Sequence, residues 1–83
     1  MKAIETRFLG PTDTKGSRYV ADDGDGNRVI VSADHSLSAE GNHESACVAL
    51  LRKMNWRGTY RGGYTSRGMA WVDQNGLAVC KEL

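Results

Sequence analysis

The spacing of apolar residues changes once along this chain, and the change limits the folds that the chain can adopt. In residues 3–9, Ile4, Thr6 and Phe8 alternate with charged residues, which is the two-residue period of a half-buried strand. From Ser38 onward the apolar residues are spaced three and four apart, the period of one helix face. They are Ala46, Cys47, Leu50, Leu51 and Met54. The sequence therefore predicts an extended N-terminal part followed by a single helix.

Further strands are predicted where branched and aromatic residues lie between groups of turn-forming residues. They are residues 17–21, 27–32, 59–60, 68–72 and 77–80. Two Asp-Gly steps in residues 22–27 favour a tight turn, Gly62-Gly63 is predicted to join the next pair of strands, and residues 73–76 are predicted to form the last turn. The expected fold is α+β: an antiparallel sheet in the order βββα and then two or three strands, with the helix packed on one sheet face.

The ends of the helix can be placed from its capping residues. Ser36 or Ser38 offers the side-chain oxygen that caps a helix N-terminus. Gly41 and Asn42 are poor helix formers and are expected to weaken the first turn. Asn55-Trp56 and Gly58 are expected to mark the end of the helix.

A chain of 83 residues can form only one small core, so a single domain spanning residues 1–83 is expected. No apolar run approaches the ~20 residues that span a bilayer, and residues 1–5 lack the pattern of a signal peptide. We therefore expect a cytoplasmic location without membrane contact. In this reducing compartment Cys47 and Cys80 are expected to be free thiols in the core.

One acidic stretch resembles part of a calcium-binding loop. Asp23 and Asp25 are each followed by glycine, and Asp34 lies eleven residues beyond Asp23. Such a loop needs glycine where Arg28 stands and a bidentate glutamate where Asp34 stands. The Asp-Gly steps are instead typical of a hairpin turn, so no calcium site is predicted.

Two histidines and two cysteines raise the question of zinc or of a Cys–His nucleophile. His43 and Cys47 lie four residues apart on one face of the predicted helix, and His35 and Cys80 could complete four ligands. No CxxC or HxxxH spacing is present, and nothing in the sequence indicates an electropositive, accessible pocket that would lower a thiol pKa. We therefore predict no metal, no cofactor and no catalytic residue.

Charge is distributed unevenly along the chain. Residues 1–45 carry five basic and eight acidic side chains, a net charge of −3. Residues 46–72 carry five basic side chains and no acid, a net charge of +5. The sequence therefore predicts a molecule with one acidic and one basic side.

The basic half contains a cluster of cationic and aromatic side chains. It consists of Arg52, Lys53, Trp56, Arg57, Tyr60, Arg61, Tyr64 and Arg67. Such side chains can neutralise phosphates and stack on bases, and Trp, Tyr and Arg are also enriched among the residues that dominate protein interfaces. The alternative interpretation places Trp56 and one tyrosine in the core, with the arginines solvated. We predict that this basic-aromatic cluster binds a partner.

Four carboxylates form a second candidate surface. They belong to Asp22, Asp23, Asp25 and Asp34. Together they could present negative charge to a basic groove, as a nucleic-acid mimic does, whereas each taken singly is more typical of a solvated turn. Both candidate surfaces require the basic-aromatic cluster to gather on one accessible face, apart from these carboxylates.

The N-terminal segment resembles a family of small uncharacterised bacterial and phage proteins that begin MKAIETxFLGPTxTxGSR. The resemblance is carried by residues 1–12 and 15–18, by Asp25-Gly26-Asn27, and by residues 53–58. It implies a setting in phage or mobile elements, where proteins of this size often block host defence, anti-CRISPR proteins included. The family has no assigned catalytic residues to transfer to this chain.

We therefore expect a small non-catalytic binding protein that inhibits a host defence complex through protein–protein contact. The expected partner is a host protein or ribonucleoprotein complex, and the protein itself is expected to be a monomer or homodimer. The alternative is a small nucleic-acid-binding module that uses residues 52–67.

Overall fold

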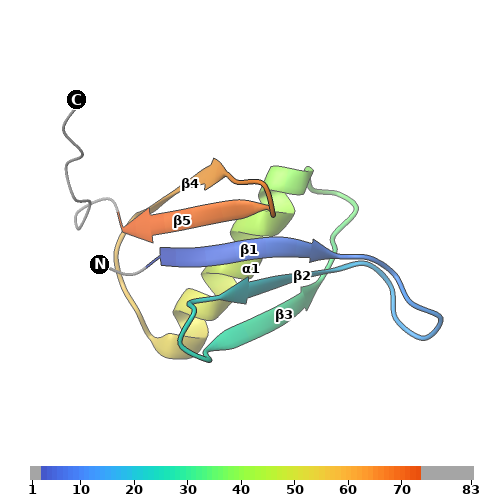
Figure 1. Ribbon diagram of the computed structural model, residues 1–83, viewed down its shortest axis with the longest axis horizontal. Coiled ribbons are helices and arrows are strands. Elements are labelled where there is room, and N and C mark those ends of the chain that lie inside the picture. Colours follow the sequence, from blue (N-terminus) through green and yellow to red (C-terminus); the bar gives the residue numbers. More distant parts are fainter. Residues whose placement is uncertain (1–2, 74–83) are drawn as a thin grey trace.

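Strand β1 (Ala3–Leu9) lies at the centre of the sheet, because it pairs with β2 on one side and with β5 on the other. The structure is a computed structural model and describes residues 3–73. The other elements are β2 (Arg18–Asp22), β3 (Arg28–Ser32), α1 (Ala39–Met54), β4 (Tyr60–Tyr64) and β5 (Met69–Asp73). The strand order is β3-β2-β1-β5-β4, and each neighbouring pair is antiparallel. The predicted α+β fold, with one helix on one face of an antiparallel sheet, is confirmed (Figure 1).

The core lies between α1 and one face of the sheet. Because strand residues alternate between faces, Ile4 and Ala21 point to the same side, where they pack with Ala46 and Leu50 of the helix. Ile4, Ala21, Ala46 and Leu50 are completely buried. The helical positions predicted from their spacing therefore face the sheet, with Leu51 partly buried at the margin of the core.

The helix begins and ends at residues that the sequence indicated. The Ser38 hydroxyl accepts a hydrogen bond from the Gly41 N–H over 3.1 Å, which satisfies one of the free donors of the first turn. Asn55 adopts the left-handed conformation with φ of 55°, and its N–H donates to the Arg52 carbonyl. The predicted strand at residues 77–80 lies outside the described residues, and so does the predicted turn at residues 73–76 except for Asp73, which ends β5.

Asn42, in the first part of the helix, makes tertiary contacts that the sequence did not predict, while the predicted weakness of the first turn stays a prediction. This residue is buried, and its Oδ1 accepts a hydrogen bond from the Asp34 N–H over 2.7 Å. Its Nδ2 donates to the carbonyls of Asp34 and Ser38 over 3.0 and 3.1 Å. Asn42 therefore ties the loop before the helix to the first turn.

The predicted turn at Gly62-Gly63 is wrong. Both glycines lie inside β4, and the turn between β4 and β5 is instead closed by a hydrogen bond from the Thr65 N–H to the Gly68 carbonyl. Gly62 lies opposite Trp71, and a Cβ at this position would meet the indole ring at 2.6 Å. Glycine is therefore required here by the packing of a large ring on the strand.

We predict that Leu50→Ala lowers the free energy of unfolding by ~2–5 kcal/mol, because it leaves a cavity where a fully buried side chain packs between helix and sheet. Urea denaturation followed by tryptophan fluorescence measures the change. Leu37→Ala, at a position 43% exposed, is the control and should cost far less. Equal losses for the two variants would contradict the placement of the core.

The two adjacent glycines of β4 offer a second test. Gly62→Ala should destabilise the protein by ~1–3 kcal/mol, because the new methyl group overlaps the Trp71 ring. Gly63→Ala is the matched control, since a methyl group added there would meet no heavy atom within 4 Å. It should be neutral or slightly stabilising through a less flexible unfolded chain. The same destabilisation from both substitutions, measured by thermal unfolding, would argue against the packing of Trp71 on Gly62.

Candidate interaction surface

The helix covers one face of the sheet, and the strand residues that point the opposite way form a second face, here called the open face. Figure 1 looks onto this face, with α1 behind the sheet. Side chains alternate between the two faces along each strand, and the pairing register shows which residues of the five strands share this face. The larger side chains among them are Glu5, Arg7, Leu9, Arg18, Val20, Asp22, Arg28, Ile30, Ser32, Arg61 and Val72.

Arginine dominates the charge of the open face. Four arginines come from the strands, and Arg67 of the β4–β5 turn joins them by lining a depression of about 150 Å³ together with Glu5, Arg7 and Asp22. Within residues 3–73, the strand positions of this face carry four arginines and two acids, a net charge of +2, and Arg67 and Asp23, which line depressions beside Glu5 and Asp22, add one charge of each sign. Negatively charged partners are therefore attracted to it.

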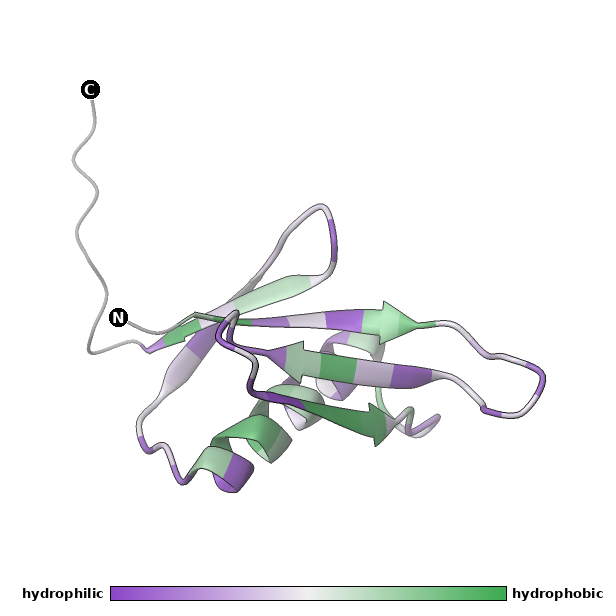
Figure 2. Ribbon diagram, turned by 60° about the horizontal axis from the view of Figure 1, so that its bottom comes forward, coloured by the Kyte–Doolittle hydropathy of each residue, from purple (hydrophilic) through white to green (hydrophobic). Residues whose placement is uncertain are grey.

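Two apolar residues, Val20 and Ile30, lie side by side on the β2–β3 part of the open face. Val20 is paired with Arg7 on one side and with Ile30 on the other, and it is almost completely buried by its neighbours. Ile30 is 41% exposed on edge strand β3. Figure 2 shows that β3 is hydrophobic along most of its length after a hydrophilic start. Val29 and Val31 of this strand face the helix and pack against the core, so Ile30 is the exposed apolar side chain that β3 adds to the charged open face.

Aromatic rings in the strands all lie on the helix side of the sheet. Phe8, Tyr19, Tyr60, Tyr64 and Trp71 occupy the alternate positions of their strands, opposite to the open face. Trp56, which follows the helix, packs against the core. Within residues 3–73, the open face therefore presents no ring from a strand on which a base could stack.

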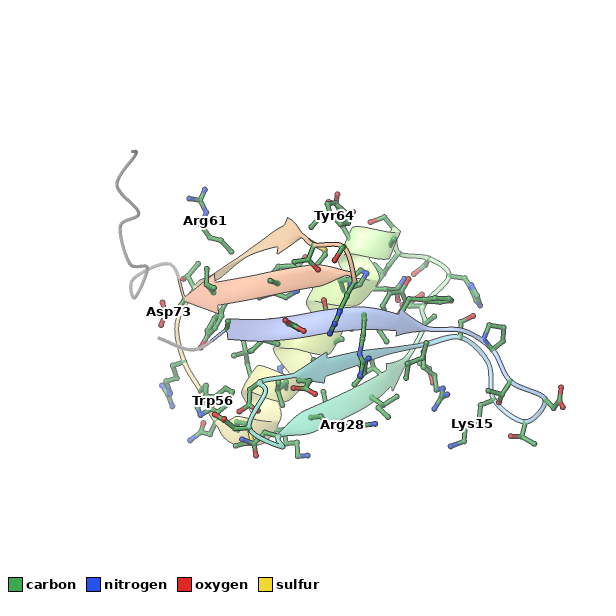
Figure 3. The ribbon with its side chains drawn as sticks, in the orientation of Figure 1. Lys15, Arg28, Trp56, Arg61, Tyr64 and Asp73 are labelled. Carbon is green, nitrogen blue, oxygen red and sulfur yellow. The ribbon has the colours of Figure 1, made fainter. Side chains whose placement is uncertain are left out.

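The basic-aromatic cluster predicted from the sequence does not form one surface. Its members at the C-terminal end of α1 are Arg52, Lys53, Trp56 and Arg57, those on the open face are Arg61 and Arg67, and the two tyrosines Tyr60 and Tyr64 lie on the helix side of β4. Figure 3 shows Trp56, Arg61 and Tyr64 at three separate places around the molecule. Partner binding by these residues remains a prediction, but they are not a single face.

Two contacts explain why the cluster divides. The Lys53 ammonium donates to the Arg28 carbonyl over 2.8 Å, which places the end of the helix beside the start of β3. The Tyr64 hydroxyl donates to Glu40 over 2.8 Å, and this contact places the end of β4 beside the first turn of the helix. The members thus lie at opposite ends of α1, because β4 runs back along the length of the helix.

The expected separation of basic and acidic surfaces along the chain is likewise wrong. The turn that contains Asp23 and Asp25 immediately precedes Arg28, whose carbonyl receives the Lys53 ammonium. Basic residues at the helix end therefore lie near the acidic turn. Charge is segregated by sheet face instead, because strand alternation directs arginines from both halves of the chain to the open face.

The four predicted acidic residues serve mainly in turns. Asp23 accepts hydrogen bonds from the N–H groups of Asp25 and Asn27 over 2.8 and 3.2 Å. Asp34 accepts from both the hydroxyl and the N–H of Ser36, and these bonds hold the pKa of the Asp34 carboxyl below its usual value. The Asp22 carboxylate accepts from the Gly24 N–H. These contacts agree with the interpretation of each residue as part of a turn.

Three buried polar side chains lie between the sheet and the helix. The Trp71 indole N–H donates to Thr6 Oγ1 over 3.0 Å, and Thr6 Oγ1 lies 2.8 Å from His43 Nδ1. The indole N–H can only donate, so the arrangement suits a Thr6 hydroxyl that donates its own hydrogen to an unprotonated Nδ1. Burial lowers the pKa of His43, which favours this neutral imidazole.

Cys47 lies one helical turn beyond His43. Burial, and after it the nearby Glu44 carboxylate, raises the pKa of the Cys47 thiol to about 11. The thiol is therefore protonated at physiological pH, which is the opposite of what an activated nucleophile or a thiolate ligand requires. Among residues 3–73, no three or more His, Cys, Asp or Glu side chains are grouped as metal ligands.

Comparisons with protein-family models, with curated proteins and with solved structures found no match. In the part of the chain that the structure describes, no helix has the length and apolar character needed to cross a membrane.

Sequence reasoning missed three arginines of the open face. Arg7, Arg18 and Arg28 belong to the half of the chain with net negative charge, so the charge pattern does not assign them to a basic surface. A signal that locates Arg7 is present, because it alternates with Ile4, Thr6 and Phe8. Joining it to Arg28 and Arg61 requires the strand order, which the local pattern does not contain.

We predict that stability falls as the pH is lowered from 7.5 to 5. The folded-state pKa of His43 lies below its ordinary value of 6.5, so the unfolded chain binds a proton more readily. The stabilisation is fully present above pH 6.5 and is lost as the pH falls toward the lower folded-state pKa. Urea unfolding at several pH values measures this slope. His43→Gln, which cannot ionise, should flatten it, and an unchanged slope in that variant would rule out His43 as its source.

Proposed function

We propose that this protein is a non-catalytic binding protein that attaches to an acidic surface of a protein partner through the open face of its sheet. The observation that carries the proposal is the combination of five arginines with the exposed side chain of Ile30 on a sheet face that the helix leaves uncovered. Arginine and apolar side chains together are typical of the energetically important part of protein interfaces.

The composition of the open face favours a protein over a nucleic acid. Glu5 and Asp22 line the same depression as Arg7 and Arg67, and carboxylates at this position would repel phosphates. Ile30, which is 41% exposed, offers apolar contact, which a phosphate backbone does not use. Base stacking would need rings, and the strand rings lie on the helix side.

The size of the open face suggests how the contact is completed. Five strands about 4.8 Å apart and about 17 Å long present roughly 300 Å² in projection. A standard interface buries about 800 Å² on each partner. Residues 10–17, which form a loop extending beyond the end of the sheet, are placed to add to the contact (Figure 1).

We further propose that the partner belongs to a host defence complex and that binding blocks one of its surfaces. Support for this setting comes from the resemblance of residues 1–18 to small phage and bacterial proteins. A domain that acts by covering a surface needs no catalytic group, which is compatible with the protonated state of the Cys47 thiol. The nucleic-acid alternative is kept as an outcome of the experiment.

The test compares two charge-reversed variants in capture from a nuclease-treated lysate of a host strain. Arg7→Glu combined with Arg28→Glu should weaken retention of the partner by about tenfold or more, because both arginines lie on the open face. Arg52→Glu combined with Arg57→Glu reverses the same number of exposed charges at the helix end and should change retention by less than about twofold.

Two results would overturn the proposal. Loss of capture only in the Arg52/Arg57 variant would move the contact to the helix end. Tight oligonucleotide binding in a gel-shift titration, weakening steeply with salt and abolished by the open-face variant, would assign the open face to nucleic acid.

A further inference from the structure

A cleft of about 560 Å³ lies at one end of the open face, where the loop before β2 meets the segment after β3. Lys15 comes from the loop, Arg18 from the first position of β2, and His35 from the segment that leads to the helix. Figure 3 shows Lys15 on the loop that extends past the sheet. Three elements thus bring basic side chains to one hollow.

The ionisable side chains that line the cleft are basic. Within residues 3–73, the ionisable residues that line it are Lys15, Arg18 and His35, and no carboxylate does. Ile30 and Ala33 provide an apolar wall beside them. This combination fits a ligand that has an anionic end and a less polar body, because cations fix the charged end while the apolar wall removes the body from water.

Arg18 carries the second observation. Its Nε is buried and has no hydrogen-bond partner. Within residues 3–73, no other buried side-chain nitrogen or oxygen lacks one. A buried donor without an acceptor is costly, and a guanidinium offers Nε and a terminal nitrogen together to the two oxygens of an oxyanion. A ligand oxyanion in the cleft would supply the missing acceptor.

We propose that this cleft binds a phosphate monoester of about the size of a mononucleotide. A guanidinium together with an ammonium group suits a phosphate dianion, which has more charge and more acceptor positions than a carboxylate. The volume lies within the ~300–1,000 Å³ of small-molecule sites. The proposal goes beyond the protein contact proposed above and does not depend on it, because the site is formed by this chain alone.

The experiment titrates the full-length protein with adenosine monophosphate at constant ionic strength, followed by amide chemical shifts in NMR and by calorimetry. Saturable shifts should appear at Ser17, Arg18 and Ser32. Adenosine should bind at least tenfold more weakly, and so should adenosine 5′-carboxylic acid. Equal binding of the carboxylic acid would overturn the assignment to phosphate, and shifts spread over the whole open face would overturn the site.

Matched variants locate the binding. Arg18→Gln should weaken the affinity for adenosine monophosphate by at least tenfold, and Lys15→Gln, on the exposed loop, by at least threefold. Arg7→Gln, elsewhere on the open face, is the control and should change it by less than twofold. If Arg18→Gln fails to fold, Lys15→Gln still decides the question. Unchanged affinity in the Lys15 variant, or equal losses in the Arg7 control, would reject the cleft as the site.

Discussion

The packing of α1 against one face of the sheet is the constraint on which the rest of this structure depends. Ile4 and Ala21 meet Ala46 and Leu50 there, in a core that also contains Tyr19, Cys47, Met69 and Trp71. A single helix can cover only one face. The opposite face is therefore left to solvent or to a partner, and the residues that alternate with the core positions become its surface.

This division explains how one surface acquires its charge. Arg7, Arg28 and Arg61 are distant in sequence and lie in regions of different net charge, yet they point the same way because each occupies an outward position of its strand. The same alternation turns the strand aromatics toward the helix. A basic surface without rings follows, which suits an acidic protein surface better than exposed bases.

The residues between helix and sheet show how polar groups are accommodated in a small core. Thr6 joins the Trp71 indole to the His43 imidazole, so that three polar side chains are buried with hydrogen-bond partners. Asn42 is likewise buried, and its amide bonds to the N–H and the carbonyl of Asp34 in the loop before the helix. These residues stabilise the frame that holds the open face in position, and the neutral state that burial imposes on His43 makes this frame sensitive to acid.

Local pattern was sufficient for the strand of residues 3–9, for the α+β class and for a serine cap at Ser36 or Ser38, because period and capping depend only on neighbours in sequence. It was insufficient for Gly62, where the ring of Trp71 on the next strand leaves no room for a side chain. It was also insufficient for Asn42, which bonds to Asp34 in the loop before the helix. The sequence by itself determined which residues alternate and limited the helix cap to Ser36 or Ser38. Only the tertiary structure decided which arginines share a face, because that depends on the order in which the strands pair.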